Sequence, residues 1–151
     1  VSERKPMSIV LAGRKPEKTA NLAREIQSCC ACPVSPSDFD SQSLAERISQ
    51  ANIVINTTPI GMFPNGMESP VPDGVFENRQ VVFDAIYNPP KTRFLLQAEQ
   101  AGARTINGLR MFVHQGAEQF RLWTGMEPPV EVMEQTVRKC LMIASENEGS
   151  H

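Results

Sequence analysis

Short apolar runs alternate along this chain with segments whose apolar residues recur at helical spacing. Apolar runs of a few residues that end at glycine or polar turn residues are typical of buried strands. The sequence therefore predicts strands over 7–12, 51–57, 81–87 and 103–106, and a short edge strand over 31–34, where Pro33 limits pairing.

Apolar residues at intervals of three and four predict helices over about 17–28, 43–50, 92–101 and 108–124, and a last helix that follows Pro128–Pro129 and extends to about Ser145. The helix from Gly108 has an expected core face of Leu109, Phe112, Val113, Gly116, Phe120 and Trp123. Alternating strands and helices predict an α/β fold with a mainly parallel sheet and helices on both of its faces.

The composition is that of an ordinary globular domain and excludes several function classes. The chain has 151 residues, with 15 Lys and Arg against 17 Asp and Glu, giving a net charge of −2. This balance argues against a general nucleic-acid binder and against a polybasic membrane anchor. The apolar runs are too short for a transmembrane helix, so no membrane partner is expected.

The positions of the cysteines and prolines further restrict the possible classes of protein and the possible secondary structure. Cys29, Cys30 and Cys32 are crowded together and Cys140 is distant, which suits neither a disulfide framework nor a zinc site. Reduced thiols in a cytoplasmic protein without a bound metal are the favoured interpretation. The many prolines between positions 59 and 90 predict a long loop there.

The first strand end carries a cluster of cations. Arg14, Lys15 and Lys18 follow Gly13, and no acid stands at the corner of residues 13–15. In a dinucleotide-binding domain, an acid at this corner would hold the 2′-hydroxyl of NAD, whereas arginine accommodates the 2′-phosphate of NADP. A solvated basic turn before a helix is an equally good interpretation of these residues alone.

Polar residues also follow the next two strands. Thr58 lies in a turn that either hydrogen-bonds a ribose or only shapes the loop. Tyr87 would either meet a ligand with its hydroxyl or pack as a half-buried ring with a wet tip. Asp84 is interpreted as a brace for the neighbouring backbone.

The helix from Gly108 carries a second stripe, with Met111 and Gln115 at spacings of three and seven. Gln115 both donates and accepts hydrogen bonds, which suits a polyol substrate, and Met111 could pack against an aromatic cofactor ring. The alternative is that Met111 fills the core and Gln115 is a surface amide. His114 lies on another face and is interpreted as a surface or packing residue.

Four segments together resemble shikimate dehydrogenase: GRKPEK (13–18), NTTPIGM (56–62), DAIYNPPKTRFLLQAEQAG (84–102) and NGLRMFVHQGAEQFRLWTG (107–125). The last two are the most specific. The resemblance implies the C-terminal, NADP-binding part of an oxidoreductase that reduces 3-dehydroshikimate to shikimate with NADPH, in chorismate and aromatic amino-acid biosynthesis.

The resemblance also implies roles for individual residues. Arg14, Lys15 and Lys18 would bind the adenosine 2′-phosphate. The other implied contacts are Thr58 beside the adenosine half of NADP, Ala85, Gly108 and Met111 along the nicotinamide, and Tyr87 and Gln115 on the substrate. The family usually has Asn-Arg-Thr at the first corner, so Gly13 and Lys15 remove an amide contact and add a charge.

Two parts of the family pattern have no counterpart here: an N-terminal substrate domain with a catalytic Lys and Asp, and a first strand followed by a glycine-rich turn. We therefore expect residues 1–145 to form an incomplete Rossmann-like NADP-binding domain with a disordered tail over 146–151. In the usual strand order 3-2-1-4-5-6 the missing strand is central, so two groups of strands would lack their shared neighbour. A missing N-terminal part or a partner chain would complete the sheet.

Three hypotheses about function remain at this point. The leading one is part of an NADP-dependent shikimate dehydrogenase that is inactive as an isolated chain. A quinate or shikimate dehydrogenase using NAD is the nearest rival, and the cations at 14–18 argue against it. A non-catalytic nucleotide-binding or assembly module is the alternative from another class.

Overall fold

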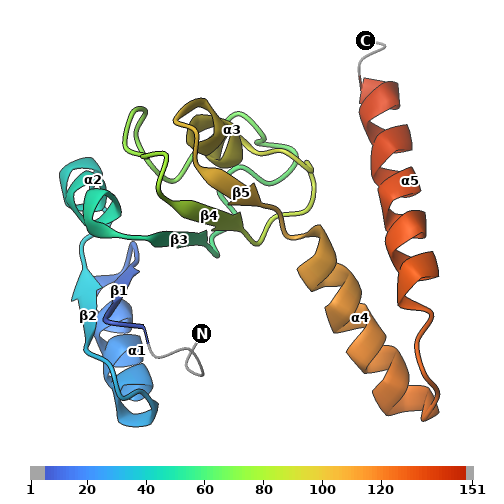
Figure 1. Ribbon diagram of the computed structural model, residues 1–151, viewed down its shortest axis with the longest axis horizontal. Helices are drawn as coiled ribbons and strands as arrows, with labels where there is room; N and C mark the ends of the chain where they lie inside the picture. The colour runs from blue at the N-terminus through green and yellow to red at the C-terminus, as the bar shows by residue number, and fades with distance from the viewer. Residues whose placement is uncertain (1–5, 149–151) are drawn as a thin grey trace. The chain divides into compact units, whose positions relative to one another are not determined.

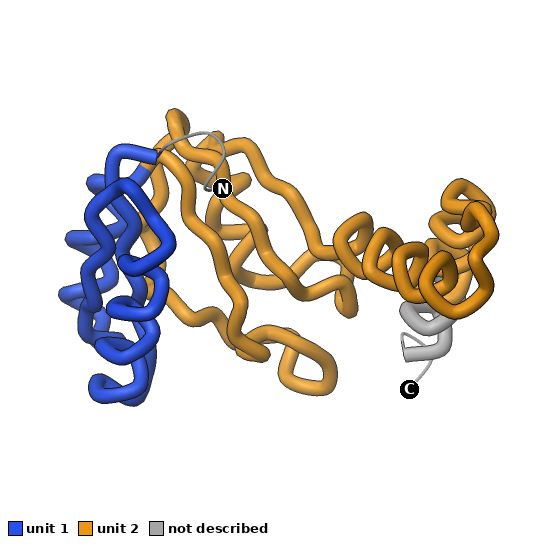
Figure 2. The backbone as a smooth tube through the Cα atoms, turned by 90° about the horizontal axis from the view of Figure 1, so that it is seen from below, with its two compact units in different colours: residues 1–51 blue, residues 52–151 orange. Residues whose placement is uncertain are grey.

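The structure is a computed structural model that describes residues 6–148, with side chains through residue 141. The chain divides into two compact units, residues 1–51 and 52–151, coloured separately in Figure 2. Both units combine helices with parallel strands, which confirms the predicted α/β class.

The first unit is built from two strands and two helices. Strand β1 (Ile9–Ala12) pairs in parallel with β2 (Val34–Ser37), and helix α1 (Pro16–Cys29) connects them, as Figure 1 shows. Helix α2 (Ser41–Gln50) follows and buries Leu44 and Ile48. Pro16 occupies the first turn of α1, where its missing N–H costs no hydrogen bond.

The predicted strand over 31–34 is misplaced by three residues. Strand β2 begins at Val34 and contains Pro36, which stands opposite Leu11 of β1. A proline inside a strand is tolerated at a sheet edge, because its missing N–H then faces away from the paired neighbour. In the described chain β2 pairs only with β1, so it is an edge strand.

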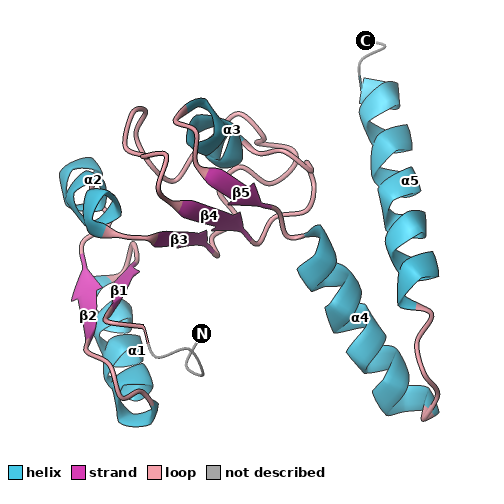
Figure 3. Cartoon of the chain, in the orientation of Figure 1, coloured by secondary structure: helices cyan, strands magenta, loops and turns pink. Residues whose placement is uncertain are grey.

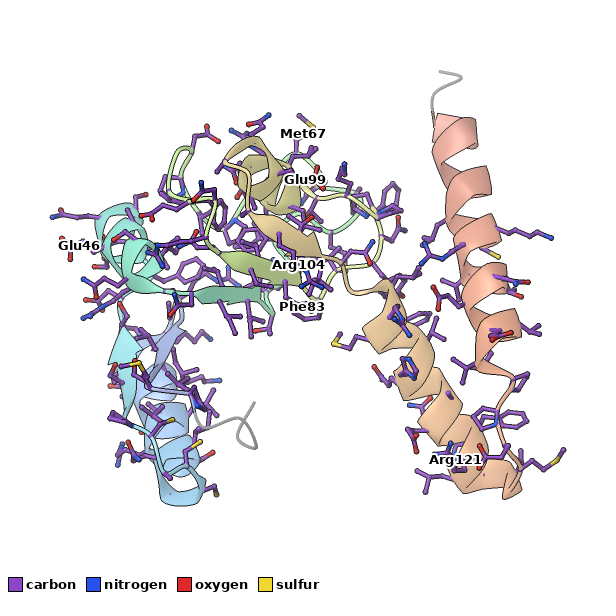
Figure 4. The ribbon with its side chains drawn as sticks, in the orientation of Figure 1. Glu46, Met67, Phe83, Glu99, Arg104 and Arg121 are labelled. Atoms are coloured by element: carbon purple, nitrogen blue, oxygen red, sulfur yellow. The ribbon has the colours of Figure 1, made fainter. Side chains whose placement is uncertain are left out.

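The second unit contains a three-stranded parallel sheet in the order β3 (Ile53–Asn56), β4 (Val81–Asp84) and β5 (Arg104–Ile106). Helix α3 (Arg93–Gln100) packs beside β4 and β5. The core of the second unit includes Phe94 of α3, whose ring contacts Phe76 edge-to-face with ring centroids 5.3 Å apart. Figure 4 labels Phe83 on β4 and Arg104 on β5. A long loop without helix or strand joins β3 to β4, as the prolines predict.

Two helices end the second unit (Figure 3): α4 (Leu109–Thr124) and α5 (Val130–Glu148). Leu109, Val113 and Ala117 are the buried residues of α4. The predicted core face therefore holds at Leu109 and Val113 but is wrong at Phe112, which is 37% exposed, and at Trp123, which is 80% exposed. The buried positions of α4 all lie between Leu109 and Ala117, and the helical period continues beyond Ala117 without further buried residues.

Strand pairing in the described chain stops at two open edges. Strand β1 pairs only with β2, and β3 pairs only with β4, so the strands form two separate sheets. This break lies where the missing central strand was expected. Val10 of β1 and Ile53 and Ile55 of β3 are at least two-fifths exposed although they are large apolar residues.

None of the helices between residues 6 and 148 combines the length and apolar character that a bilayer crossing requires. Helix α5 continues to Glu148, so residues 146–148, which were expected to begin the disordered tail, are helical. Residues 149–151 of that tail lie outside the described residues.

Candidate functional site

The first unit carries a candidate phosphate site, the basic corner, which consists of residues 13–18 between β1 and α1. Arg14, Lys15 and Lys18 are exposed, and none of them forms an ion pair within the described part of the chain. Lys15 is the N-cap residue of α1, and no side chain caps the helix there. The partial positive charge of a helix N-terminus and three unpaired cations form a donor set that suits a phosphate group.

Gly13 is required by the packing beneath this corner. A Cβ atom at position 13 would lie 2.4 Å from Oγ1 of Thr19. The Thr19 side chain is buried, and its hydroxyl donates to the carbonyl of Lys15 at 3.1 Å, so it cannot easily move aside. A side chain at position 13 would therefore require Thr19 to shift.

A separate group of candidate residues belongs to the other unit, at the carboxyl ends of β3 and β4. Oδ1 of Asn56 accepts hydrogen bonds from the backbone N–H of Thr58 at 2.9 Å and from its hydroxyl at 2.8 Å. Oγ1 of Thr58 accepts in turn from the Ile60 N–H at 3.3 Å. The hydroxyl proton of Thr58 is therefore used within the turn, so its oxygen is left only as an acceptor and a ligand would have to donate to it.

Asp84 lies at the centre of a buried hydrogen-bond network. Its Oδ1 accepts from Nδ2 of Asn56 and from the Ile86 N–H, both at 3.1 Å, and its Oδ2 accepts from the Thr92 hydroxyl at 2.6 Å. Burial raises the pKa of Asp84 above its ordinary value, and the three hydrogen bonds oppose that rise. These contacts confirm that Asp84 braces the neighbouring backbone.

The end of β4 lies directly against the start of α4. The Gly108 N–H donates to the Ile86 carbonyl at 3.1 Å. A Cβ atom at Gly108 would lie 2.0 Å from the carbonyl oxygen of Ala85. Glycine is needed here because the Ala85 backbone fills the space a side chain would take, a reason the sequence did not reveal. The approach of a nicotinamide ring to Gly108 stays a prediction.

Tyr87 and the exposed stripe of α4 lie beside this junction. The ring of Tyr87 stacks on Phe112, with centroids 4.1 Å apart and planes 18° from parallel. Met111 is 46% exposed, so the alternative that it fills the core is wrong. Gln115 is exposed one turn further along α4. In this unit, the structure brings Ala85, Tyr87 and Gly108 together.

Asn56 and Thr92 are the site residues that sequence reasoning missed, and Phe112, which was expected in the core face, instead stacks on Tyr87. Asn56 precedes the Thr-Thr pair and Thr92 begins a predicted helix, so their positions carried a signal for turn and cap formation. Their partnership with Asp84 depends on strand pairing and could not be read from spacing. The structure shows no cluster of three His, Cys, Asp or Glu side chains able to hold a metal ion among its described residues.

Comparison with known proteins agrees with these motifs. Residues 108–138 match the shikimate 5′-dehydrogenase C-terminal domain. A shikimate dehydrogenase (NADP(+)) of Methanosarcina mazei is 43% identical over 133 residues, which are 88% of this chain and 47% of that protein. The chain is related to the C-terminal half of shikimate dehydrogenases. The resemblance drawn from its motifs is thereby confirmed.

Solved structures place the same relationship in three dimensions. A shikimate dehydrogenase crystallised with NADP+ matches with a TM-score of 0.75 and 36% identity, over 89% of this chain and 47% of that one. A quinate dehydrogenase of Corynebacterium glutamicum in complex with NAD matches with a TM-score of 0.79 and 29% identity, over 88% of this chain and 46% of that one. The chain spans about half the length of the shikimate dehydrogenases it matches.

Proposed function

We propose that this chain is the NADP-binding half of a shikimate dehydrogenase, an oxidoreductase of chorismate and aromatic amino-acid biosynthesis that interconverts 3-dehydroshikimate and shikimate. The observation that carries the proposal is the junction of the two most specific motifs. Gly108 closes on Ala85 and Ile86, and Tyr87 stacks on Phe112 beside it.

The residues of the basic corner fit NADP. Arg14, with its planar fork of donors, would hold the adenosine 2′-phosphate, and Lys15 and Lys18 would add positive charge. Ala85, Gly108 and Met111 would line the nicotinamide, and Thr58 would lie beside the adenosine half. When bound, NADPH supplies the hydride that reduces the ketone carbon of 3-dehydroshikimate.

The substrate contacts come from Tyr87 and Gln115. The Tyr87 hydroxyl and the Gln115 amide each donate and accept, so they can hold a polyhydroxylated ring against the nicotinamide. Holding the two reactants in line accounts for a large share of the rate of such a step. The proton for the reacting oxygen would come from the Lys and Asp of the family's N-terminal domain, and this chain supplies no residue for that role.

We also propose that a further polypeptide segment completes the two sheets. The free edges of β1 and β3 support this, as does the coverage of only 47% of the relative's length. The segment is the counterpart of the relatives' N-terminal part, in the same polypeptide or in a partner chain. The four cysteines are free thiols, which supports a cytoplasmic location.

A quinate dehydrogenase using NAD is the second candidate function. The TM-score of 0.79 to the quinate dehydrogenase in complex with NAD favours it. The three unpaired cations of the basic corner favour NADP, because a 2′-phosphate is the feature of NADP that they would recognise.

The test is saturation kinetics on the full reading frame that encodes the chain, with shikimate or quinate and with NADP or NAD. We expect shikimate oxidation with a clear preference for NADP. Arg14→Gln should raise the KM for NADP about tenfold or more through loss of a charged phosphate contact, and should leave the KM for NAD unchanged. Arg24→Gln on the exposed surface of α1 is the matched control.

Other outcomes decide against the proposal. Preference for NAD and quinate supports the second candidate, and absence of turnover with every pair supports a non-catalytic module. The chain of residues 1–151 alone should show no turnover, and shikimate oxidation by it would contradict the proposed need for a completing segment.

A further inference from the structure

Asp84 connects three elements of the second unit, and the proposed mechanism does not use it. From the end of β4 its carboxylate reaches Asn56 of β3, the backbone of Ile86, and Thr92 at the N-cap of α3. All three partners donate hydrogens to it, and none of them titrates. The side chain has no exposed surface.

The hydrogen bond from the Ile86 N–H to Asp84 fixes the backbone between two proposed site residues, Ala85 and Tyr87. The N–H of Ile86 is held by Asp84 at 3.1 Å, and its carbonyl is held by the Gly108 N–H at 3.1 Å. The Ile86 side chain is also buried, at 6% exposure. Ile86 is therefore fixed on both sides of its backbone, and its neighbours Ala85 and Tyr87 are the residues proposed to meet the nicotinamide and the substrate.

A second hydrogen bond to Asp84 comes from Asn56, which also holds the turn at Thr58. Asn56 donates to Asp84 and uses its Oδ1 to hold Thr58 through two hydrogen bonds. Both bonds to Thr58 can persist when Asp84 is removed, because they do not involve the Asn56 nitrogen. Loss of Asp84 should therefore disturb the segment 85–87 more than the turn at Thr58.

We propose that Asp84 is a positioning residue for the nicotinamide and substrate side of the site, acting through the Ile86 peptide. The inference rests on the proposed function and adds a residue that touches neither ligand. It predicts that the two halves of cofactor recognition respond differently to loss of Asp84. The basic corner belongs to the other unit and should keep its affinity for a phosphorylated adenosine.

Two variants of Asp84 separate positioning from stability. Asp84→Ala removes all three acceptor contacts. Asp84→Asn keeps one oxygen for Asn56 and Ile86, while its new N–H₂ group faces the Thr92 hydroxyl, which can turn to accept. Val82→Ala is the matched control, since Val82 is fully buried in the same strand and has no part in the network.

The experiment measures shikimate kinetics with NADP on the full reading frame, and binding of 2′,5′-ADP by calorimetry. Asp84→Ala should lower kcat/KM for shikimate by about tenfold to a hundredfold, the scale of a misplaced reacting group. Its Kd for 2′,5′-ADP should stay within about threefold of wild type, a change of less than 1 kcal/mol. Asp84→Asn should restore most of the lost kcat/KM, and Val82→Ala should match wild type in both measurements.

Asn56→Asp gives an independent test if Asp84→Ala does not fold. It places a second carboxyl at hydrogen-bond distance from Asp84, so one of the pair must hold a proton. The kcat/KM of this variant should fall as rising pH removes the shared proton, beyond any change in wild type. A pH profile identical to that of wild type would overturn the inference.

The outcomes distinguish the two proposals. If wild type oxidises shikimate and Asp84→Ala and Val82→Ala have equal kcat/KM, the positioning role of Asp84 is overturned and the proposed function stands. Absence of shikimate turnover by wild type overturns the proposed function and this inference with it.

Discussion

Asp84 keeps an acidic group where it has no contact with water, and this gives the fold a pH dependence of known sign. Burial raises the pKa of its carboxyl in the folded chain. From the ordinary carboxyl pKa up to this raised value, the folded form binds more protons than the unfolded form. The contribution of Asp84 to stability is therefore full at low pH and falls as pH rises through that window.

Asp84→Asn should remove this dependence because an amide does not titrate. We expect the free energy of unfolding of wild type to fall relative to that of the variant as pH rises from about 4, the ordinary carboxyl range. Urea unfolding of both proteins between acidic and neutral pH measures the difference. A wild type that gains stability relative to the variant over this range would show that the pKa is lowered.

Gly108→Ala should destabilise the second unit strongly. The added methyl group would meet the Ala85 carbonyl oxygen 2.0 Å away, and neither backbone can shift without breaking the bond between Gly108 and Ile86. Overpacking of this kind costs roughly 3 kcal/mol. Gly66→Ala is the control, because its Cβ would have only an ordinary contact at 3.7 Å, with Pro89. Equal unfolding midpoints for the two variants would contradict the prediction.

At the scale of single residues, the sequence predicts the chemical role of a residue better than it predicts which residue it contacts. The cations at 14–18 and the bracing role of Asp84 follow from where they stand at strand ends. The Asn56 contact does not, since the two residues are 28 positions apart and meet only because the register sets Asn56 opposite Asp84. Gly108 was predicted to admit a ligand, and only the observed backbone of Ala85 shows the packing reason for a glycine.

Helix α4 packs against α5 through a small residue. A Cβ atom at Gly116 would lie 3.3 Å from the terminal methyl of Met133. Arg121, labelled in Figure 4, pairs with Glu118 at 2.8 Å and with Glu127 beyond the helix end at 3.1 Å. Helix α4 ends at Thr124, and its C-cap residue Gly125 has a φ of 69°, in the left-handed region that glycine adopts without strain.

Gly116→Ala should stabilise the chain by up to about 1 kcal/mol, the difference in helix propensity between the two residues. The gain is expected because the atom in the way is the far end of a flexible methionine, which can change rotamer. Thermal unfolding measures the shift, with Met133→Leu as a companion variant that reports the contact by itself. A lower midpoint for Gly116→Ala would show that Met133 cannot move.

The order of helices and strands was predictable because apolar periodicity differs between strands and helices. The residues at which each helix or strand begins and ends were harder to predict. The strands have only three or four residues, shorter than the apolar runs, because pairing ends where the polar turns begin. Trp123 continues the helical period of α4 and yet is exposed, since the period does not show where burial stops.

The free edge of β3 matters for the molecule as a whole. The N–H groups of Val81 in β4 and of Ala85, which directly follows β4, donate to the carbonyls of Asn52 and Asn56. In a parallel pair, backbone groups alternate between the two sides of a strand, so those of Ile53 and Ile55 face the free edge. Exposed, unpaired edges with apolar side chains are places where another strand can add.

Amide exchange should reveal whether this edge is completed. In the chain alone, the amides of Ile53 and Ile55 should exchange fast, while that of Val54, which faces β4, is protected. In the protein of the full reading frame all three should be protected. Fast exchange at Ile53 and Ile55 in both proteins would contradict completion by an added strand.

The exposure of Trp123 has a practical consequence, because it is the single tryptophan of the chain. Its indole emission comes from a ring already in water, so unfolding of the core should change the spectrum little. Covering the end of α4 with another surface would shift the emission to shorter wavelength. The chain thus carries an intrinsic optical reporter of what binds at this end of α4, independent of the stability of the domain.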